Sequence, residues 1–301
     1  MQSSRDAGVG SSQRNRLLAD HRTPSELDVP PTLGSPRTDP SLHEVRAGNT
    51  PQEAPLEGRV VLVTGASSGI GAAVAETLAE MGARVAVLAR RKARLDEVVQ
   101  RILDRGGEAV ALKADVSIRS EVEAARDTVV GRWGRIDILV NNAGVMPLSP
   151  VGDLRVEDWE RMVDVNVKGV LYGIAAVLPG MRERGDGHIV NVGSVAGRRP
   201  FPGGTVYAAT KFAVRALSAG IQLELSSEAG IRITDVQPGV VDTELMDHIP
   251  DETVRGRFAE TWRERRTLRA DDVAQAVLFA VTAPTRVNVN EILIRPTDQP
   301  T

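Results

Sequence analysis

Two residues of one segment, Tyr207 and Lys211, have the types and the spacing that proton transfer requires. Four positions apart on a helix, a phenol and an ammonium group lie one turn apart on the same face. A free phenol has a pKa of about 10 and exchanges protons poorly at neutral pH, but a nearby cation favours the phenolate and lowers that pKa. Because Tyr-x-x-x-Lys is also an ordinary helix pair, its meaning depends on its surroundings.

A serine lies thirteen residues before Tyr207, just after the apolar stretch His188–Val192. If this stretch is a strand, Ser194 sits at its carboxyl end, where a hydroxyl can hold a substrate oxygen and steady the charge that develops on it. The sequence Gly193-Ser194-Val195-Ala196-Gly197 is not G-x-S-x-G, and no suitable base follows it. A serine hydrolase is therefore disfavoured.

A glycine-rich turn follows the first apolar run of the chain. Val60–Thr64 leads directly into Gly65-Ala66-Ser67-Ser68-Gly69-Ile70-Gly71. Glycines here allow a tight turn and a close approach of the backbone to a pyrophosphate, which the free N–H groups and the dipole of the following helix can hold. The spacing is GxxxGxG rather than the commoner GxGxxG. We predict that Gly65, Ser67, Ser68, Gly69, Ile70 and Gly71 bind a dinucleotide.

The second predicted strand ends at Ala89, and two arginines, Arg90 and Arg91, follow it. A site that prefers NAD usually places an acid at this point to hold the ribose 2′-hydroxyl. A guanidinium group instead matches a 2′-phosphate in charge and geometry. We therefore predict a preference for NADP(H), with NAD(H) not excluded; the alternative is that both arginines belong to a solvated helix start.

Apolar strands alternate with helical stretches from Gly58 onward. Strands buried along their whole length predict an α/β, Rossmann-like, doubly wound parallel sheet with helices on both faces, whose ligand lies at the carboxyl ends of the strands. The predicted strands are Val60–Thr64, Arg84–Ala89, Ala109–Ala114, Ile136–Asn141, His188–Val192, Ile231–Gln237 and Val289–Ile294. The predicted helices are Ile70–Met81, Leu95–Arg105, Glu121–Trp133, Val156–Val177, Val206–Glu228 and a last one from Asp271 to Val281.

Two segments depart from this alternation. Residues 1–57 are rich in proline and lack periodicity, so we predict a disordered extension before a single catalytic domain, 58–301. Within that domain, Glu244–Leu268 interrupts the pattern and is expected to form a lid over the substrate. Its apolar residues Leu245, Met246, Ile249, Phe258 and Trp262 are available to face inward, and Met146, Pro147, Leu148 and Val195–Phe201 are expected to line the substrate site.

Composition excludes several classes of function. Cysteine is absent, and the four histidines have no partner at metal-ligand spacing, so we expect neither a thiolate nucleophile nor a metal site. A net charge of −3 and 3% aromatic residues give no sign of nucleic-acid binding. No apolar run approaches the roughly 18–20 residues that span a bilayer, and a cytoplasmic protein is expected.

With these motifs together, the chain resembles the short-chain dehydrogenase/reductase family in its single-domain branch, from about Gly58 to Pro300. Within it, the sequences around Asp242–Leu245 and Glu291–Gln299 are similar to the branch that contains clavulanate dehydrogenase. The resemblance implies that Tyr207 is the general acid and base, that Lys211 binds the nicotinamide ribose and lowers the pKa of Tyr207, and that Ser194 positions the carbonyl. It further implies that Asn166 holds a water of the proton relay. The implied cofactor contacts also include Asp115, Val116, Asn142, Ala143, Gly144, Pro238, Gly239 and Thr243.

The resemblance implies hydride transfer between NADP(H) and a small carbonyl or alcohol substrate: an aldehyde, a ketone or a 3-hydroxy acid. It also implies a homodimer or homotetramer with the helices around Val156–Val177 and Val206–Glu228 between subunits. Two alternatives stay open at this point. One is a nucleotide-binding regulator that has lost catalysis, although Ser194, Tyr207 and Lys211 are all present. The other is a sugar-nucleotide epimerase or dehydratase, whose larger C-terminal domain this chain lacks room for.

Overall fold

The computed structural model describes residues 54–225, 230–263 and 265–299. The fold described below is that of the unit Pro51–Thr301. Most of the extension predicted to be disordered lies outside the described residues. Its last part does not fit the prediction: Leu56 is buried, and its backbone N–H donates to Met81 O at 2.9 Å, so the folded part begins before Gly58.

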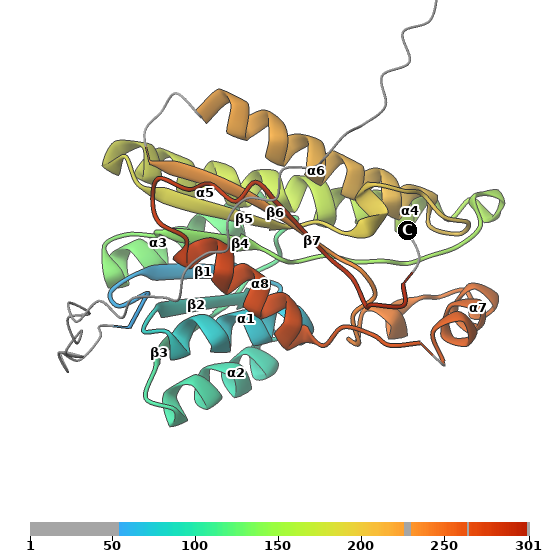
Figure 1. Ribbon diagram of the computed structural model, residues 1–301, viewed down its shortest axis with the longest axis horizontal. Coiled ribbons are helices and arrows are strands. Elements are labelled where there is room, and N and C mark those ends of the chain that lie inside the picture. The colour runs from blue at the N-terminus through green and yellow to red at the C-terminus, as the bar shows by residue number, and fades with distance from the viewer. Residues whose placement is uncertain (1–53, 226–229, 264, 300–301) are drawn as a thin grey trace, which may run out of the picture. The chain divides into compact units, whose positions relative to one another are not determined.

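Seven parallel strands form one sheet in the order β3-β2-β1-β4-β5-β6-β7 (Figure 1). The strands are β1 (Val60–Thr64), β2 (Arg84–Ala89), β3 (Glu108–Lys113), β4 (Ile138–Asn141), β5 (Gly187–Val192), β6 (Ile231–Pro238) and β7 (Glu291–Ile294). Strand order reverses between β1 and β4, and the carboxyl ends of these two strands frame the place where a doubly wound sheet binds its ligand. The predicted fold class is confirmed.

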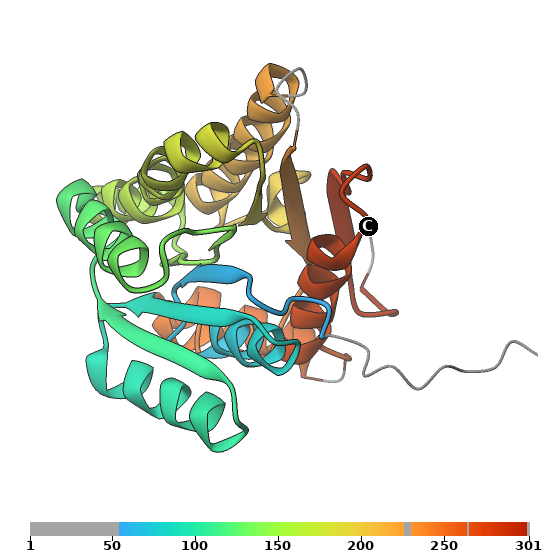
Figure 2. The same ribbon diagram turned by 90° about the vertical axis from the view of Figure 1, so that its left-hand side faces the viewer.

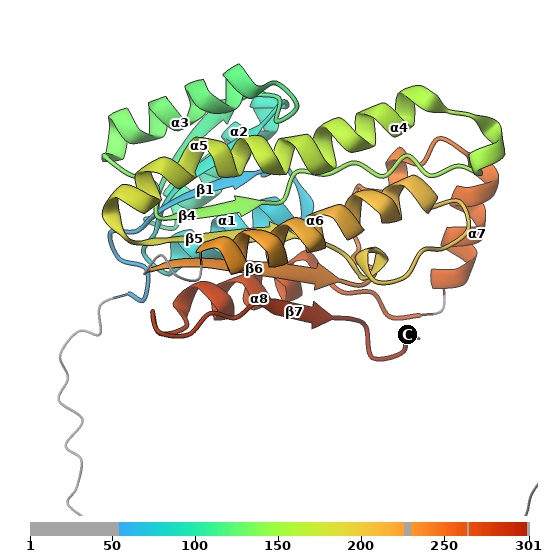
Figure 3. The ribbon, with the colours of Figure 1, turned by 90° about the horizontal axis from the view of Figure 1, so that it is seen from above.

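Helices cover both faces of the sheet, as Figures 2 and 3 show. They are α1 (Gly69–Glu80), α2 (Lys92–Asp104), α3 (Arg119–Trp133), α4 (Val156–Val163), α5 (Gly169–Arg184), α6 (Thr205–Leu225), α7 (Glu252–Trp262) and α8 (Ala270–Thr282). Alternate residues of β1 enter two separate apolar cores: Val61 and Val63 pack with α1, α2 and α8, while Val60 and Leu62 pack with α3, α5 and α6. Burial on both faces explains why the strand is apolar throughout.

Several predicted boundaries differ from the structure. The long helix expected over Val156–Val177 is α4 and α5, joined by a π-helical turn at Asp164–Lys168, and it continues to Arg184. The strand β4 begins at Ile138 and β7 at Glu291, each two residues later than predicted, and α7 was not predicted at all. The helical run Val156–Arg184 is long and apolar enough, by length and composition, to cross a membrane, contrary to our reading of the sequence. It is a core element here, because Val170, Ile174 and Val177 pack against the sheet.

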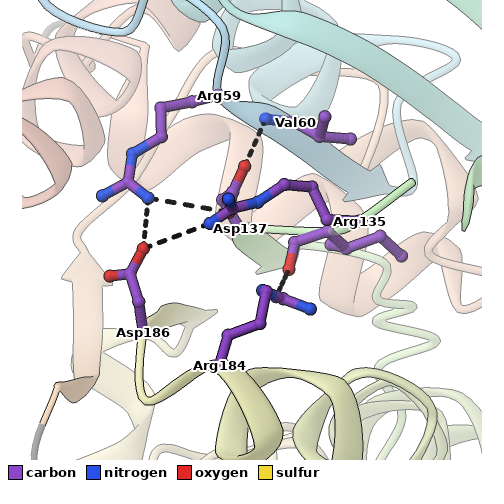
Figure 4. Close-up of polar contacts among 7 residues, drawn as sticks. Arg59, Val60, Arg135, Asp137, Arg184 and Asp186 are labelled. Carbon is purple, nitrogen blue, oxygen red and sulfur yellow. Dashed lines mark hydrogen bonds and ion pairs between the residues drawn. The ribbon is translucent and has the colours of Figure 1, made fainter. Parts of the chain in front are cut away.

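Charged residues form a cluster at the opposite side of the sheet, at the amino ends of β1 and β4 (Figure 4). Asp137 is 1% exposed, and its carboxylate accepts a hydrogen bond from Val60 N at 2.8 Å. Arg135 pairs with the same carboxylate, and Arg59 lies 3.6 Å from it while pairing with the more exposed Asp186. A buried carboxylate is tolerated only when paired, so this cluster fixes the start of β1 against the start of β4.

Replacing Asp137 by alanine should therefore lower the free energy of unfolding by about 2–4 kcal/mol, because the amide of Val60 and two guanidinium groups lose their acceptor. Urea unfolding measures the loss. The matched control is Asp186→Ala, which removes a half-exposed partner of Arg59 and should cost less than about 1 kcal/mol. Equal losses in the two variants would contradict the assignment of Asp137 as the anchor of this edge.

Candidate active site

The glycine turn leaves the first turn of α1 open to a ligand. Gly65 has φ +66°, and a Cβ there would lie 2.7 Å from Ala143 Cα; a Cβ on Gly71 would collide with Asn142 Nδ2. Ser68 occupies the N-cap position of α1, yet its side chain does not cap the helix, and no acid lies in the first turn. The N–H groups at this helix start therefore stay available to an anion.

The loop after β4 is fastened to the end of β1 through the hydroxyl of Thr64. Thr64 Oγ1 accepts hydrogen bonds from Asn142 N at 3.0 Å and Ala143 N at 3.1 Å, and it donates to Val140 O at 3.3 Å. Asn142 Nδ2 in turn donates to the carbonyl oxygens of Thr64 and Gly65, at 3.0 and 3.2 Å. These bonds hold the backbone of Asn142, Ala143 and Gly144 beside the glycine turn, as expected for residues that line a cofactor.

The two arginines after β2 lie at the same end of the cleft. Arg91 donates to Ser67 Oγ at 3.0 Å and to Ser68 Oγ at 2.7 Å, and its third contact is Glu244 Oε2 at 2.9 Å. Arg90 lies 3.8 Å from Asp115 Oδ2, and Asp115 also accepts hydrogen bonds from Ser117. The hydrogen bond from Arg91 holds the pKa of Glu244 below its usual value. The sequence did not reveal this link between Arg91 and Glu244.

Tyr207 and Lys211 lie one turn apart on α6, and both are 6% exposed. Lys211 Nζ donates to Val192 O at 2.8 Å and lies 5.9 Å from the centroid of the Tyr207 ring. Burial raises the pKa of Tyr207 to about 12, against a lowering by its hydrogen bond with Ser194. Burial lowers the pKa of Lys211 to about 8. In the protein without a bound coenzyme, the rise in the pKa of Tyr207 through desolvation is therefore larger than the lowering expected from Lys211.

Ser194 directly follows the end of β5 and caps a short 3-10 helix, Val195–Gly197. Its Oγ accepts a hydrogen bond from Ala196 N at 3.1 Å, which fixes the rotamer. The interaction of this hydroxyl with Tyr207 lowers the pKa of the phenol, and both side chains line the same cleft. One hydroxyl held by a strand end and one held by a helix thus converge on the same point of the cleft.

Asn166 lies in the π-helical turn between α4 and α5, a feature often found at functional sites. Its Oδ1 accepts from Val145 N at 2.8 Å, and its Nδ2 donates to Val145 O at 2.9 Å and Thr210 Oγ1 at 3.1 Å. The side chain therefore connects the loop after β4 to α6. Its contact on α6, Thr210, directly precedes Lys211. The expected role of Asn166 in holding a water stays a prediction.

One cleft of about 1150 Å³ joins these groups. All of the predicted cofactor and catalytic residues line it except Gly71 and Asn166. Its lining includes Gly65, Ser67, Ser68, Gly69, Ile70, Arg90, Arg91, Asp115, Val116, Asn142, Ala143, Gly144, Ser194, Tyr207, Lys211, Pro238, Gly239 and Thr243. Residues far apart in the sequence thus form one continuous surface.

The segment Glu244–Leu268 lies over one end of this cleft, where Figure 3 places α7 beyond the tips of β6 and β7. Its two ends are tied together, since Asp242 N donates to Leu268 O at 2.8 Å and Leu268 N to Val240 O at 2.9 Å. Three of its apolar residues face inward as predicted: Leu245, Met246 and Ile249 pack with Met146, Leu148, Phe201 and Tyr207. The structure does not describe the side chains of Phe258 and Trp262.

Three further arginines line the cleft, and two of them come from outside the segment Glu244–Leu268. Arg161 on α4, Arg257 on α7 and Arg295 after β7 all line it, and none has a side-chain hydrogen bond or ion pair with a described residue. The two acids in the lining, Asp115 and Glu244, are paired with Arg90 and Arg91. The cleft therefore has unpaired positive charge away from the glycine turn. No group of three potential metal-ligating side chains occurs among the described residues.

Comparisons with known proteins agree with this geometry. The family model for short chain dehydrogenases matches residues 59–253. An uncharacterized oxidoreductase of Staphylococcus saprophyticus is 44% identical over 246 residues, which cover 81% of this chain and 98% of the relative.

Two solved structures are similar at lower identity. The closed form of a serine dehydrogenase complexed with NADP+ has a TM-score of 0.74 at 38% identity, and the match covers 80% of this chain and 96% of the other. A gluconate 5-dehydrogenase from Burkholderia cenocepacia in complex with NADP and tartrate has a TM-score of 0.72 at 33% identity, with coverage of 81% and 96%. On its sequence, its fold and the arrangement of its cleft, this chain belongs to the short-chain dehydrogenase family.

Proposed function

We propose that this protein is an NADP(H)-dependent oxidoreductase that interconverts a small alcohol and the corresponding carbonyl compound. The observation that supports the proposal most strongly is the convergence of Ser194, Tyr207 and Lys211 in one cleft with the open start of α1. A regulator without catalysis would not need a buried phenol and a buried ammonium group at this place, because both are costly to desolvate.

The residues around the glycine turn fit NADP(H). The open N–H groups at the start of α1 suit a pyrophosphate, and Arg91, held between Ser67 and Ser68, offers a guanidinium group where a 2′-phosphate is expected. Arg90, Asp115, Val116 and the backbone of Asn142–Gly144 complete the surface for the adenosine and ribose groups. When bound, the coenzyme supplies or accepts the hydride and carries a positive charge on its oxidised ring.

Side chains of the protein itself accept and donate the proton. In oxidation, the phenolate of Tyr207 accepts the proton of the substrate hydroxyl; in reduction, the phenol returns it to the oxygen of the carbonyl. Ser194 donates a hydrogen bond to that oxygen and stabilises the negative charge on it. A nearby ammonium group favours the phenolate electrostatically, so Lys211 acts against the burial that raises the pKa of Tyr207.

Within the predicted range of aldehydes, ketones and 3-hydroxy acids, the cleft favours a substrate with a carboxylate. Arg161, Arg257 and Arg295 present guanidinium groups without partners among the described residues, and a carboxylate matches such a group in charge and shape. Serine, gluconate and tartrate, named for the two similar structures, all carry a carboxylate near a hydroxyl group. The segment Glu244–Leu268, which provides Arg257, is then the lid that selects the substrate.

We also propose that α5 and α6 pack between subunits of a homodimer or homotetramer. Leu171 on α5 is 38% exposed, and Phe212 on α6 is 41% exposed. Large apolar side chains at this exposure on two neighbouring helices suit a subunit interface.

Replacing Tyr207 by phenylalanine should reduce turnover by at least about 100-fold, because the proton donor and acceptor is removed. NADPH binding, followed by fluorescence titration, should change little. The matched control is the other tyrosine of the chain: Tyr172→Phe, on α5, should retain turnover. Near-normal turnover of the Tyr207 variant against every carbonyl compound that the native protein reduces would disprove the assignment.

Replacing Arg91 by alanine should weaken NADPH binding at least about tenfold, a loss of about 1.4 kcal/mol, and leave the affinity for NADH nearly unchanged. The reason is that only NADPH carries the 2′-phosphate. Arg94→Ala is the control, since Arg94 lies in the first turn of α2, close to Arg91 in sequence, but pairs with Glu97 at 3.3 Å. Similar losses for both coenzymes would show that Arg91 supports the loop rather than the phosphate.

The carboxylate preference can be tested with 3-hydroxybutyrate and its methyl ester, which share the reacting hydroxyl group. We expect kcat/KM to favour the acid at least about tenfold, and the preference to vanish when Arg161 and Arg257 are both replaced by alanine. Arg255→Ala is the control on α7, because this residue lies outside the cleft, near Glu252. A native enzyme that prefers the ester would contradict the proposal.

A further inference from the structure

A buried carboxylate lies beside the catalytic pair and has no part in the reaction described above. Asp235, on β6, is 1% exposed. Its Oδ2 accepts a hydrogen bond from Gln237 Nε2 at 2.6 Å, while its Oδ1 has no hydrogen-bond partner among the described residues. Burying a carboxylate with one oxygen unpaired is unfavourable, so its presence here requires a compensating charge.

The backbone of Val192 and Gly193 connects Asp235 to Lys211. Val192 O accepts the hydrogen bond from Lys211 Nζ at 2.8 Å. Oδ1 of Asp235 faces Gly193 so closely that a Cβ at this glycine would collide with it. Ammonium and carboxylate therefore approach the same short segment at the end of β5, next to Ser194.

The other charged groups around Asp235 are already paired with one another. Arg198, which follows β5, donates to Gln237 Oε1 and pairs with Glu291 of β7. Arg215 of α6 pairs with the same Glu291 at 2.9 Å. The contacts thus run from exposed Glu291 through Arg198 and Gln237 to Asp235. Among the described acids, Asp235 is the one whose charge raises the pKa of Lys211.

The two groups affect each other in the expected directions. Burial lowers the pKa of Lys211 to about 8, and the negative charge of Asp235 opposes this. Burial raises the pKa of Asp235 to about 6, opposed by the hydrogen bond from Gln237 and by the charge of Lys211. Between these two values, carboxylate and ammonium are both charged.

We propose that Asp235 is a positioning residue for the reaction: its carboxylate is the counter-charge that keeps buried Lys211 in the ammonium form on which the phenolate of Tyr207 depends. This inference rests on the function proposed above for Tyr207 and Lys211. It adds a residue of β6 to the pair on α6 and to Ser194, which follows β5.

The test is Asp235→Asn, which preserves the shape of the side chain and can still accept the hydrogen bond from Gln237. Without the negative charge, Lys211 should lose its proton at lower pH. In a profile of alcohol oxidation, the fall in rate at high pH should then begin about one pH unit earlier than in the native protein. Below about pH 6, where the native carboxylate is itself protonated, the two profiles should converge.

Glu291→Gln is the matched control, because it removes a carboxylate from the exposed end of the same contacts. Its profile should follow that of the native protein at high pH. A merely structural role of Asp235 would lower the rate of the asparagine variant by the same factor at every pH, and this result would overturn the proposal.

A second measurement does not depend on activity. The chain has only four lysines, Lys92, Lys113, Lys168 and Lys211, so protein labelled with ¹³C at lysine Cε should give four resolvable signals in an NMR titration. The signal of Lys211 is assigned by its loss in Lys211→Met. In Asp235→Asn this signal alone should titrate at lower pH.

The two measurements separate the two hypotheses. If Lys211 titrates identically in both proteins, Asp235 is not its counter-charge and the inference is wrong. If the titration shifts but neither protein oxidises any alcohol, the pairing of charges stands and the proposed function is wrong. Thermal unfolding of Asp235→Asn, expected to remain cooperative, shows that the comparison is between folded proteins.

Discussion

An ammonium group that is almost completely removed from water must find negative partners inside the protein, and much of this site is arranged to provide them for Lys211. The end of β5 supplies the carbonyl of Val192, and β6 supplies the carboxylate of Asp235. The helix α6 holds the lysine one turn from Tyr207. Because these partners come from three elements, the register of β5 and β6 and the packing of α6 must all be correct before the phenol has a cation beside it.

The amino ends and the carboxyl ends of the strands differ in how far their polar groups are paired. At the amino ends, Asp137 and the arginines around it satisfy one another and the first amide of β1, so that edge is closed and contributes to stability. At the carboxyl ends, the helix start at Ser68 is left uncapped, and three arginines have no partner among the described residues. Polar groups left unsatisfied at one edge are tolerated because the rest of the fold is well packed, and they are the groups that a ligand can satisfy.

The sequence predicts those parts of the molecule in which local pattern and structure coincide. Strand β1, the glycine turn and the pair Tyr207 and Lys211 follow from apolar runs and from spacing within one helix, so their places were predicted correctly. The contact between Arg91 and Glu244 joins residues 153 positions apart, and nothing in either local sequence indicates it. Asp235 escaped notice for a related reason: in a strand read only as buried and apolar, a carboxylate has meaning only once the neighbouring helix and strand are known. The π-helical turn at Asn166 was likewise not predicted, because the sequence shows one continuous helical pattern across it.

The closed base of the segment Glu244–Leu268 has a consequence for how such a protein can diverge. Because Val241 and Leu268 form a bridge and their neighbours exchange backbone hydrogen bonds, the chain leaves the sheet and returns to it at almost the same point. Residues inserted or exchanged between these two points add little loop-closure cost and leave the pairing of β6 with β7 unchanged. The residues that cover the cleft can therefore change while Ser194, Tyr207 and Lys211 beneath them keep their positions.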